Sequence, residues 1–395
     1  MTKEEKVEEI LTRGVAEVIH LDQLRAKLLS GKSLRVKFGI DPTSPNIHLG
    51  RAAAIWKLRD LQDLGHTIVF IIGDFTGIIG DTSDKESERP MLSKETVEEN
   101  LATYFDQAGK ILDMSKVEKH RNTEWLEALT YREITEHAEV FSLSDFIARE
   151  NIKVRLDKGT RVSLRELLYP MMQGYDSVAI KADVEIGGTD QRFNMLSGRK
   201  LQEHFKKEAQ NILMLDLIEG LDGRKMSSSW GNTINLTDTA NDIFGKVMSL
   251  RDEFIVKYFI HATRVSMERI SEARASLDRG ENPRDVKLDL AEEIVSMYHG
   301  KEEALRAREA FLSTFQKKEI PEDILEIRVH ENISLAEVLT QSEITSSKSD
   351  FRRLVDEGAV KRLSEKGGEE KITDYLAVAT PGVYKIGKRR FVKIV

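Results

Sequence analysis

The sequence predicts an α/β protein with a doubly wound parallel sheet in its N-terminal half, then a helical region, then a small α+β domain. Three observations lead to this fold class. Short apolar runs alternate with amphipathic helical patterns over about the first 220 residues. Residues 238–317 have helical periodicity nearly throughout, and residues 331–395 combine two helices with two or three short strands. A chain of 395 residues has room for two or three such domains.

The composition excludes several classes of protein. The chain has no cysteine, which excludes a disulfide framework, a cysteine-bound metal and a thiol nucleophile, and which fits a reducing compartment. Its N-terminus is charged and lacks an apolar run of signal length. No stretch approaches eighteen uninterrupted apolar residues, so we expect no membrane span. The simplest expectation is a cytoplasmic protein.

Charge is distributed unevenly along the chain. The whole chain carries −7, whereas residues 346–395 hold 12 Lys/Arg and 7 Asp/Glu and therefore carry +5. The remainder is then −7 − 5 = −12. A basic tail on an acidic body indicates contact with nucleic acid, although a solvated lysine-rich surface explains the charge equally well.

The first elements predict a strand–helix–strand unit. Residues 3–30 have the apolar stripes of two helices. Residues 35–40 alternate apolar and polar side chains as a strand, and a helix follows over residues 51–64. Residues 67–72 (TIVFII) are typical of a buried parallel strand. The crossover from the first strand to the second should be right-handed.

The turn inside this unit is the first candidate site. Asp41-Pro42 and Pro45 break the strand, and His48-Leu49-Gly50 comes directly before the helix. A strand, an irregular turn and a helix start together present backbone N–H groups to an anion, usually a phosphate. We therefore predict an anion site here.

A second polar segment follows the next strand. Residues 73–89 are rich in glycine, aspartate and serine, and Asp74 and Asp81 lie beyond the carboxyl end of the strand, where ligands bind in open α/β sheets. Either aspartate taken alone could equally be a turn cap. The pattern then predicts a helix, a short strand and an interrupted helical insertion over residues 93–112, 117–120 and 123–148.

The helix expected over residues 164–180 carries an unusual set of polar groups. Tyr169, Gln173 and Asp176 are spaced four and three apart, which places them on one helical face. Their neighbours are apolar, which argues against a simple solvated face. A tyrosine, an amide and a carboxylate on this face predict a small polar pocket.

Two further segments have the composition of ligand-binding loops. Gly187-Gly188 lies after a short strand that begins near Asp183, and glycines allow close backbone approach to a ligand. Residues 221–232 (LDGRKMSSSWGN) place Arg224 and Lys225 beside a run of serines, a set that suits a phosphate. Taken alone, a basic serine loop is most often just a surface loop. A helix over residues 193–206 and a strand over residues 211–217 lie between them.

Four motifs, in this order, resemble those of the tyrosyl-tRNA synthetases, which are class I aminoacyl-tRNA synthetases. They are the HLG turn after a strand, the Tyr-x3-Gln-x2-Asp helix, the GGTDQ segment and the KMSSS loop. The chain is similar to the bacterial branch in which a lysine follows the first strand. The tail sequence SSKSDFRRLVDEGAV resembles an RNA-binding domain shared with a ribosomal protein.

The resemblance implies a domain organisation. Residues 1–220 would form a Rossmann-like catalytic domain with a dimerisation insertion at about 113–165, and Trp125 falls in that insertion. Residues 221–320 would carry the KMSKS-type loop and a helical anticodon-side domain. Residues 331–395 would form the RNA-binding domain. Its expected RNA contacts are Lys348, Arg352 and Arg353.

The resemblance also implies a two-step reaction. L-Tyrosine and ATP with Mg²⁺ would give tyrosyl-adenylate and pyrophosphate, and tRNA(Tyr) would then take the tyrosyl group. Such an enzyme mainly positions reactants and stabilises developing charge, so it needs no side-chain nucleophile. We accordingly expect a homodimer without a membrane partner, a protein-held metal or a tightly bound cofactor.

The site residues carry over one by one. Thr43, His48 and Lys225 would hold the pyrophosphate end of ATP in the transition state. The full ATP-binding set would be Gly39, Asp41, His48, Gly50, Arg51, Gly188, Asp190, Lys225, Ser227 and Ser228. The tyrosine-binding set would be Lys37, Asp81, Tyr169, Gln173, Asp176 and Gln191, with Asp176 accepting the phenol proton. Lys85 and Arg89 would lie near pyrophosphate or the acceptor end of tRNA.

This sequence departs from the family pattern at three positions. The second histidine of the HIGH signature is Arg51, whose reach and charge differ from those of histidine. The second lysine of the KMSKS loop is Ser228, which leaves Lys225 as its main cation. Lys37 replaces a tyrosine that contacts the substrate phenol in many relatives, and it either pairs with Asp176 or points to the other face of its strand.

Three other functions compete with the tyrosine ligase. Exchange of pyrophosphate with tryptophan instead of tyrosine would indicate the sister synthetase, but the Tyr-Gln-Asp helix argues against it. A nucleotidyltransferase with another substrate would not explain the KMSSS loop or the basic tail. A non-enzymatic RNA-binding protein would bind tRNA without forming an adenylate, with Arg51 and Ser228 marking a decayed site.

Overall fold

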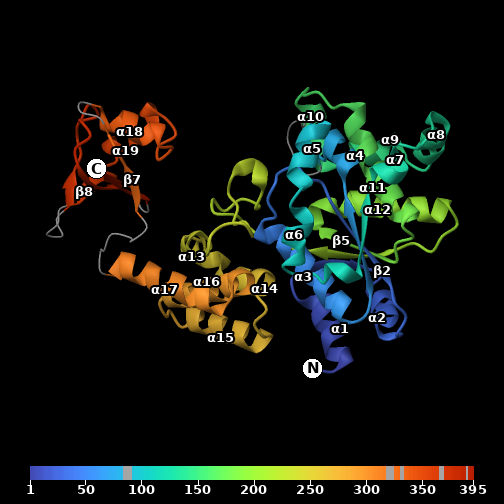
Figure 1. The fold of residues 1–395 in the computed structure, drawn as a ribbon. Coiled ribbons are helices and arrows are strands. Elements are labelled where there is room, and N and C mark those ends of the chain that lie inside the picture. The colour runs from blue at the N-terminus through green and yellow to red at the C-terminus, as the bar shows by residue number, and fades with distance from the viewer. Residues whose placement is uncertain (83–90, 317–323, 330–332, 364–368, 388–389) are drawn as a thin grey trace. The chain divides into compact units, whose positions relative to one another are not determined.

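The computed structural model describes residues 1–82, 91–316, 324–329, 333–363, 369–387 and 390–395. The chain forms two compact units, Met1–Ala304 and Leu305–Val395. Each unit contains its own sheet (Figure 1).

The sheet of the first unit confirms the predicted doubly wound architecture. Its strand order is β1-β6-β5-β2-β3-β4, and every neighbouring pair is parallel except β1 with β6. The strands are β1 (Val15–Ile19), β2 (Arg35–Ile40), β3 (Thr67–Ile72), β4 (Val117–Arg121), β5 (Val184–Gly188) and β6 (Asn211–Leu215). The chain runs from β2 outward to β3, and later from β5 outward to β6 on the other side. The strand order therefore reverses between β2 and β5, and ligands bind beyond the strand ends at such a point.

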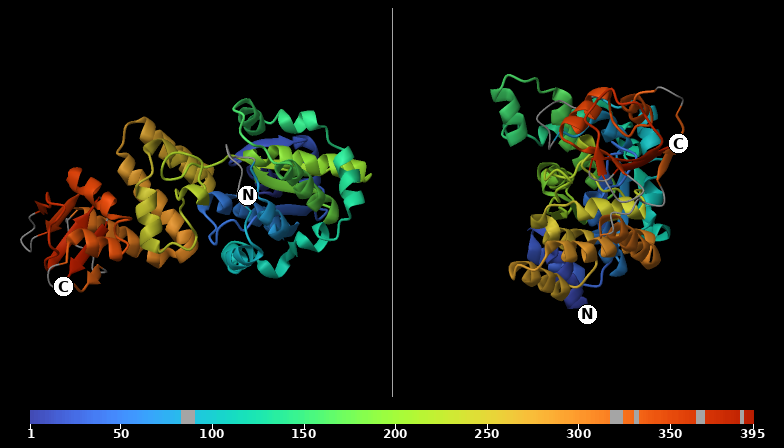
Figure 2. Two further views of the ribbon diagram at one scale, coloured as in Figure 1. Left: turned by 90° about the horizontal axis from the view of Figure 1, so that it is seen from above. Right: turned by 90° about the vertical axis from the view of Figure 1, so that its left-hand side faces the viewer.

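Helices cover both faces of this sheet (Figures 1 and 2). Since the β2–β3 and β5–β6 crossovers run in opposite directions across the sheet, right-handed connections place α3 and α12 on opposite faces. α11 packs along α12, and α4 contacts α11. The helices up to this point are α1 (Lys3–Thr12), α2 (Leu21–Leu29), α3 (Leu49–Asp63), α4 (Asp74–Ile79), α5 (Lys94–Leu101), α6 (Tyr104–Gly109), α7 (Thr123–Leu126), α8 (Tyr131–Glu139), α9 (Leu143–Ile147), α10 (Glu150–Asp157), α11 (Leu164–Ala179) and α12 (Arg192–His204).

Sequence patterns missed β1 and α4 in this unit. Residues 3–30, predicted as two helices, also contain the strand β1 between them, which starts after Gly14 at φ +65°. β1 is an edge strand that exists because it pairs with β6, nearly two hundred residues away, and no local pattern reports that pairing. The polar segment at 73–89, to which no helix was assigned, begins with the helix α4. Pairing and packing overrode local composition at both places.

The helical region follows β6 as predicted. It consists of α13 (Ala240–Met248), α14 (Ile255–Ala262), α15 (Met267–Asp278), α16 (Pro283–His299) and α17 (Lys301–Gln316). Gly280 and Gly300, at φ +81° and +88°, end α15 and α16 in a conformation that favours glycine. Among the described residues, no helix is long and apolar enough to cross a membrane.

Buried cations join the helical region to the sheet. The Arg13 guanidinium donates hydrogen bonds to four backbone carbonyls in and just after α14. The Lys57 ammonium, inside α3, donates to the carbonyls of Ile10 and Arg13, and burial lowers its pKa to about 8. The Trp56 indole donates to the Tyr298 hydroxyl at 3.0 Å. These contacts hold α3, whose first turn belongs to the predicted anion site.

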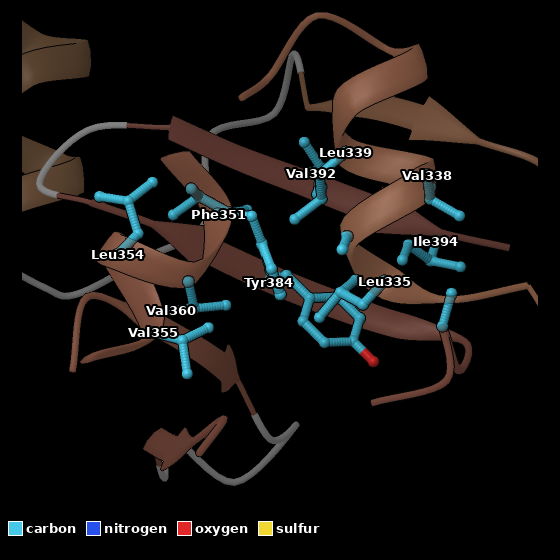
Figure 3. Close-up of a cluster of buried hydrophobic side chains, with 13 residues drawn as sticks. Leu335, Val338, Leu339, Phe351, Leu354, Val355, Val360, Tyr384, Val392 and Ile394 are labelled. Carbon is cyan, nitrogen blue, oxygen red and sulfur yellow. The ribbon is translucent and has the colours of Figure 1, made fainter. Parts of the chain in front are cut away.

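The second unit is a five-stranded sheet covered by two helices. Its strand order is β7-β11-β10-β8-β9. The elements are β7 (Leu325–Ile327), α18 (Leu335–Gln341), α19 (Lys348–Asp356), β8 (Val360–Leu363), β9 (Glu369–Lys371), β10 (Gly382–Ile386) and β11 (Arg390–Ile394). Side chains such as Leu335, Phe351 and Tyr384 form its core (Figure 3). The sequence pattern indicated no strand between the helical region and residue 331, but β7 lies there and is a strand of this sheet, parallel to β11.

Candidate active site

A cleft that opens to solvent lies at the carboxyl ends of the central strands. Sixteen of the residues predicted from the sequence line it. They are Gly39, Asp41, Thr43, His48, Gly50, Arg51, Asp81, Tyr169, Gln173, Asp176, Gly188, Asp190, Gln191, Lys225, Ser227 and Ser228. The strand order explains the convergence, since β2 and β5 are neighbours and the segments that follow them meet at one edge.

Six of the residues to which the family resemblance gave a role do not line this cleft. Lys37 lies beneath it, as described below. Lys85 and Arg89 lie outside the described residues. Lys348, Arg352 and Arg353 lie on α19 of the second unit, where Arg353 pairs with carboxylates of its own helix.

His48 stands at the start of α3 with a buried imidazole. The segment around it is held by a backbone hydrogen bond from Leu49 N–H to the Ile234 carbonyl, at 2.9 Å. Burial lowers the pKa of His48 to about 3, and the positive charges of Arg51 and Lys225 act in the same direction. Its Nδ1 has no hydrogen-bond partner within the part of the chain that the structure describes. The imidazole is therefore neutral, and His48 lines the cleft.

The turn after β2 is fixed by α6. The Tyr104 hydroxyl, fully buried, donates to the Ser44 carbonyl at 2.6 Å and accepts from Arg51 Nη1 at 2.8 Å. Arg51 Nη2 reaches the Thr43 hydroxyl at 3.3 Å. Tyr104 was not identified from the sequence, because it lies 53 residues from Arg51 and nothing local marks it.

The 225–229 loop meets the same turn. Lys225 Nζ lies 2.8 Å from Asp190 Oδ2, which joins the loop to the segment after β5. The Ser44 hydroxyl donates to the Ser228 hydroxyl at 2.9 Å. The Asn232 side chain accepts from Ser227 N–H at 2.8 Å and thereby holds the loop from behind. Asn232 is a second supporting residue that carried no sequence signal.

A second hydrogen-bonded network lines the cleft around α11. The Tyr169 hydroxyl donates to Asp41 Oδ2 at 2.8 Å, and Gln191 Nε2 donates to Asp81 Oδ2 at 2.7 Å. The Asn194 amide bridges Gln173 and Gln191, at 3.1 and 3.0 Å. The three polar residues of α11 thus share one pocket with residues of three other segments.

Asp176 is buried at the bottom of this pocket. The Trp125 indole donates to Asp176 Oδ1 at 2.8 Å, and Asn122 Nδ2 lies 3.4 Å from Oδ2. Burial raises the pKa of Asp176 to about 7, although the charge of Lys37 and both hydrogen bonds oppose the shift. Sequence reasoning placed Trp125 in a dimerisation insertion and did not identify its contact with Asp176.

Lys37 occupies neither of the two positions considered for it. Its side chain is fully buried and its ammonium contacts Glu185 Oε1, the Gln173 carbonyl and the Ser177 hydroxyl at 2.8, 2.7 and 2.8 Å. It therefore pairs with Glu185 instead of Asp176, and is not among the residues that line the cleft. Glu185, which does line the cleft, is a further residue that the sequence did not reveal.

Known proteins resemble the chain along its length. The family of class I tRNA synthetases for tryptophan and tyrosine (W and Y) matches residues 29–316. The tyrosine–tRNA ligase of Francisella tularensis is 42% identical over 388 residues, covering 98% of both chains. That of Thermotoga maritima is 43% identical over 398 residues, covering 100% of this chain and 98% of the relative.

Solved structures support the fold. The tyrosyl-tRNA synthetase of Archaeoglobus fulgidus, complexed with L-tyrosine, matches with a TM-score of 0.62 at 22% identity, over 78% of this chain and 100% of that one. A C-terminally truncated mitochondrial enzyme of Coccidioides posadasii matches with a TM-score of 0.63 at 23% identity, over 78% and 91%. Taken with the sequence relatives and the cleft, these findings show that the chain belongs to the class I aminoacyl-tRNA synthetases, and within them to the bacterial tyrosyl-tRNA synthetases.

Proposed function

We propose that the cleft activates L-tyrosine with ATP and Mg²⁺, and that the enzyme then transfers the tyrosyl group to tRNA(Tyr). A tyrosine carboxylate oxygen attacks the α-phosphorus of ATP, and pyrophosphate leaves with the electrons of the broken P–O bond. A hydroxyl of the terminal adenosine of tRNA then attacks the tyrosyl carbonyl, and AMP leaves. One observation carries the proposal: a buried carboxylate, Asp176, shares a single cleft with His48 and Lys225.

We assign the nucleotide to the end of the cleft that holds His48, Thr43 and Lys225. The neutral His48 imidazole and the Thr43 hydroxyl donate hydrogen bonds to phosphate oxygens. Lys225 gives up Asp190 and turns to the phosphates, which frees Asp190 for the ribose hydroxyls. Such groups stabilise charge that develops on the pyrophosphate in the transition state.

We assign tyrosine to the end around α11. Asp81, Tyr169 and Gln173 surround the substrate ammonium, and Gln191 lies on the carboxylate side. Asp176 accepts the phenol proton. Trp125 and Asn122 each donate to one oxygen of this carboxylate, and phenylalanine would leave the acceptor position meant for the phenol without a donor, which is costly.

The remaining expectations concern partners. We propose that α19, with Lys348, Arg352 and Arg353, contacts tRNA, since an exposed basic helix is suited to phosphate. Mg²⁺ arrives with ATP as part of the substrate. A homodimer and a cytoplasmic location stay predictions from the sequence.

Pyrophosphate exchange tests the activation step. Purified protein with L-tyrosine, Mg-ATP and radiolabelled pyrophosphate should transfer label into ATP, and omission of tyrosine is the control. Exchange with tryptophan but not with tyrosine would overturn the assignment of Asp176. Tight tRNA binding without any exchange would instead favour a non-enzymatic RNA-binding protein.

A further inference from the structure

Among the described residues that line the cleft, more side chains are negative than positive. Its acidic lining residues are Asp41, Asp81, Asp176, Glu185, Asp190 and Asp216. Among the described lining residues, the permanent cations are Arg51 and Lys225. Lys225 already pairs with Asp190 at 2.8 Å. The binding of a polyphosphate in this cleft therefore depends strongly on the position of the Arg51 guanidinium.

Among the described residues, the contacts of the Arg51 guanidinium are with neutral oxygen atoms. Nη1 donates to the Tyr104 hydroxyl at 2.8 Å, and Nη2 lies 3.3 Å from the Thr43 hydroxyl and 3.4 Å from the Asp41 carbonyl. Within the described part of the chain, no carboxylate lies in ion-pairing distance of this guanidinium. A partly buried cation without a counter-ion is unfavourable until an anion approaches, so the arrangement favours anion binding.

Tyr104 fixes the direction of the guanidinium. Its hydroxyl has one proton, which it donates to the Ser44 carbonyl at 2.6 Å, so toward Arg51 it can only accept. The Tyr104 side chain is fully buried on α6 and cannot follow Arg51 if Arg51 turns away. The guanidinium is thereby kept beside the Thr43 hydroxyl.

We propose that Arg51 and Thr43 together form a clamp for the departing pyrophosphate, and that Tyr104 is the positioning residue of this clamp. The inference rests on the proposed function and goes further, because it assigns Arg51 to the pyrophosphate rather than to the ribose. Arg51 thus supplies a further cation for the phosphates, beside Lys225 as the main cation of a loop that carries Ser228 where the family pattern has a lysine. An arginine fork binds two phosphate oxygens at once, which a histidine cannot do.

The reverse reaction isolates this contact. Enzyme-bound tyrosyl-adenylate is mixed with increasing pyrophosphate, and ATP formation gives the KM for pyrophosphate and the maximal rate. Arg51→Met should raise the KM for pyrophosphate about tenfold or more, the loss expected for a charge-assisted hydrogen bond. The KM for tyrosine in the forward reaction should stay within about twofold. Tyr104→Phe should raise the KM for pyrophosphate in the same direction but less.

Matched variants separate positioning from folding. Arg59→Met removes an arginine from the same helix that lies outside the cleft and pairs with Asp63 at 2.9 Å. Tyr384→Phe removes a buried hydroxyl from the second unit. Neither should change the KM for pyrophosphate. If Tyr104→Phe lowered Tm as Tyr384→Phe does but left that KM unchanged, the positioning role would be wrong.

Two results would overturn the clamp itself. One is an Arg51→Met enzyme with an unchanged KM for pyrophosphate. The other is an Arg51→Met enzyme in which the KM for ATP rises and inhibition by AMP weakens to the same extent, with no change in the KM for pyrophosphate. AMP has the ribose but lacks the pyrophosphate, so this result would assign Arg51 to the ribose. A wild-type protein that catalyses no tyrosine-dependent exchange would instead refute the proposed function.

Discussion

At the scale of single residues, the phenol end of the cleft depends on what surrounds Asp176. The carboxylate is buried, and its described donors are the Trp125 indole and the Asn122 amide. A substrate phenol adds one more donor. The supporting side chains are therefore as important for selectivity as the carboxylate that meets the substrate.

Trp125→Phe tests this support. The variant keeps an aromatic ring but loses the donor to Asp176 Oδ1, so the KM for tyrosine should rise by about tenfold, the typical loss of a hydrogen bond to a charged group. The KM for ATP should not change. Trp56→Phe is the control, since its indole donates to the Tyr298 hydroxyl of α16 and neither residue lines the cleft. Equal effects of the two variants on tyrosine KM would contradict the role of Trp125.

The pKa of Asp176, raised to about 7 by burial, gives a second prediction. An ionised carboxylate accepts the phenol proton more strongly than a neutral acid does, so 1/KM for tyrosine should increase as pH rises through about 7. Asp176→Asn should abolish this dependence. The folded state binds the extra proton between about pH 4 and 7, so this group lowers the free energy of unfolding as pH rises across that window. A tyrosine KM that is flat from pH 6 to 8 would exclude titration of Asp176.

The sequence allowed part of this site to be predicted. Tyr169, Gln173 and Asp176 share a helix, so their spacing alone places them on one face. Tyr104, Trp125 and Asn122 reach the site from other elements, and no local spacing marks them. Lys37 was ambiguous for a different reason. Strand alternation assigns a face, but helices cover both faces of a parallel sheet, so alternation cannot say which face holds the ligand.

At the scale of elements, a buried ion pair joins α11 to the two central strands. Lys37 on β2 and Glu185 on β5 meet at 2.8 Å, and both contact groups of α11. Strand β2, strand β5 and helix α11 all contribute residues to the cleft. The pair therefore holds β2, β5 and α11 in place beneath the cleft, although Lys37 itself does not line the cleft.

Removing one partner of this pair should be more damaging than removing both charges. Lys37→Met leaves Glu185 buried and unpaired, which should cost about 3–5 kcal/mol in the free energy of unfolding. Lys37→Met combined with Glu185→Gln should cost less than Lys37→Met alone. Urea unfolding can be followed by fluorescence, because all three tryptophans lie in the first unit. If the costs of the two substitutions simply added in the double variant, the pair would not be energetically coupled. Arg59→Met, which breaks an exposed ion pair, is the control and should cost under about 1 kcal/mol.

The same scale explains why the sequence did not reveal the strands β1 and β7. β1 is an edge strand that depends on β6, and β7 is a three-residue strand that depends on β11. Helices such as α11 carry their own period and were predicted closely. Short strands at sheet edges are defined by partners far along the chain, so local patterns cannot find them.

At the scale of the whole molecule, the two units should have separable tasks. The cleft lies entirely in Met1–Ala304, whereas α19 belongs to Leu305–Val395. A chain that ends at Gln316 retains α17 and removes β7 together with the rest of its sheet. It should keep tyrosine-dependent pyrophosphate exchange and lose most charging of tRNA(Tyr). Normal charging by this truncated enzyme would remove the second unit from the reaction.

The attachment of the N-terminus has a consequence for how the protein is made. Arg13 and β1 find their partners only at residues 259–265 and 211–215. A ribosome adds about 5–20 residues per second. At the slower of these rates, the first twenty residues emerge well over ten seconds before their partners do. Until β6 has been made, the β1 segment has no strand to pair with, and its backbone hydrogen-bonding groups stay exposed. We expect a holding chaperone to bind the nascent chain at this stage.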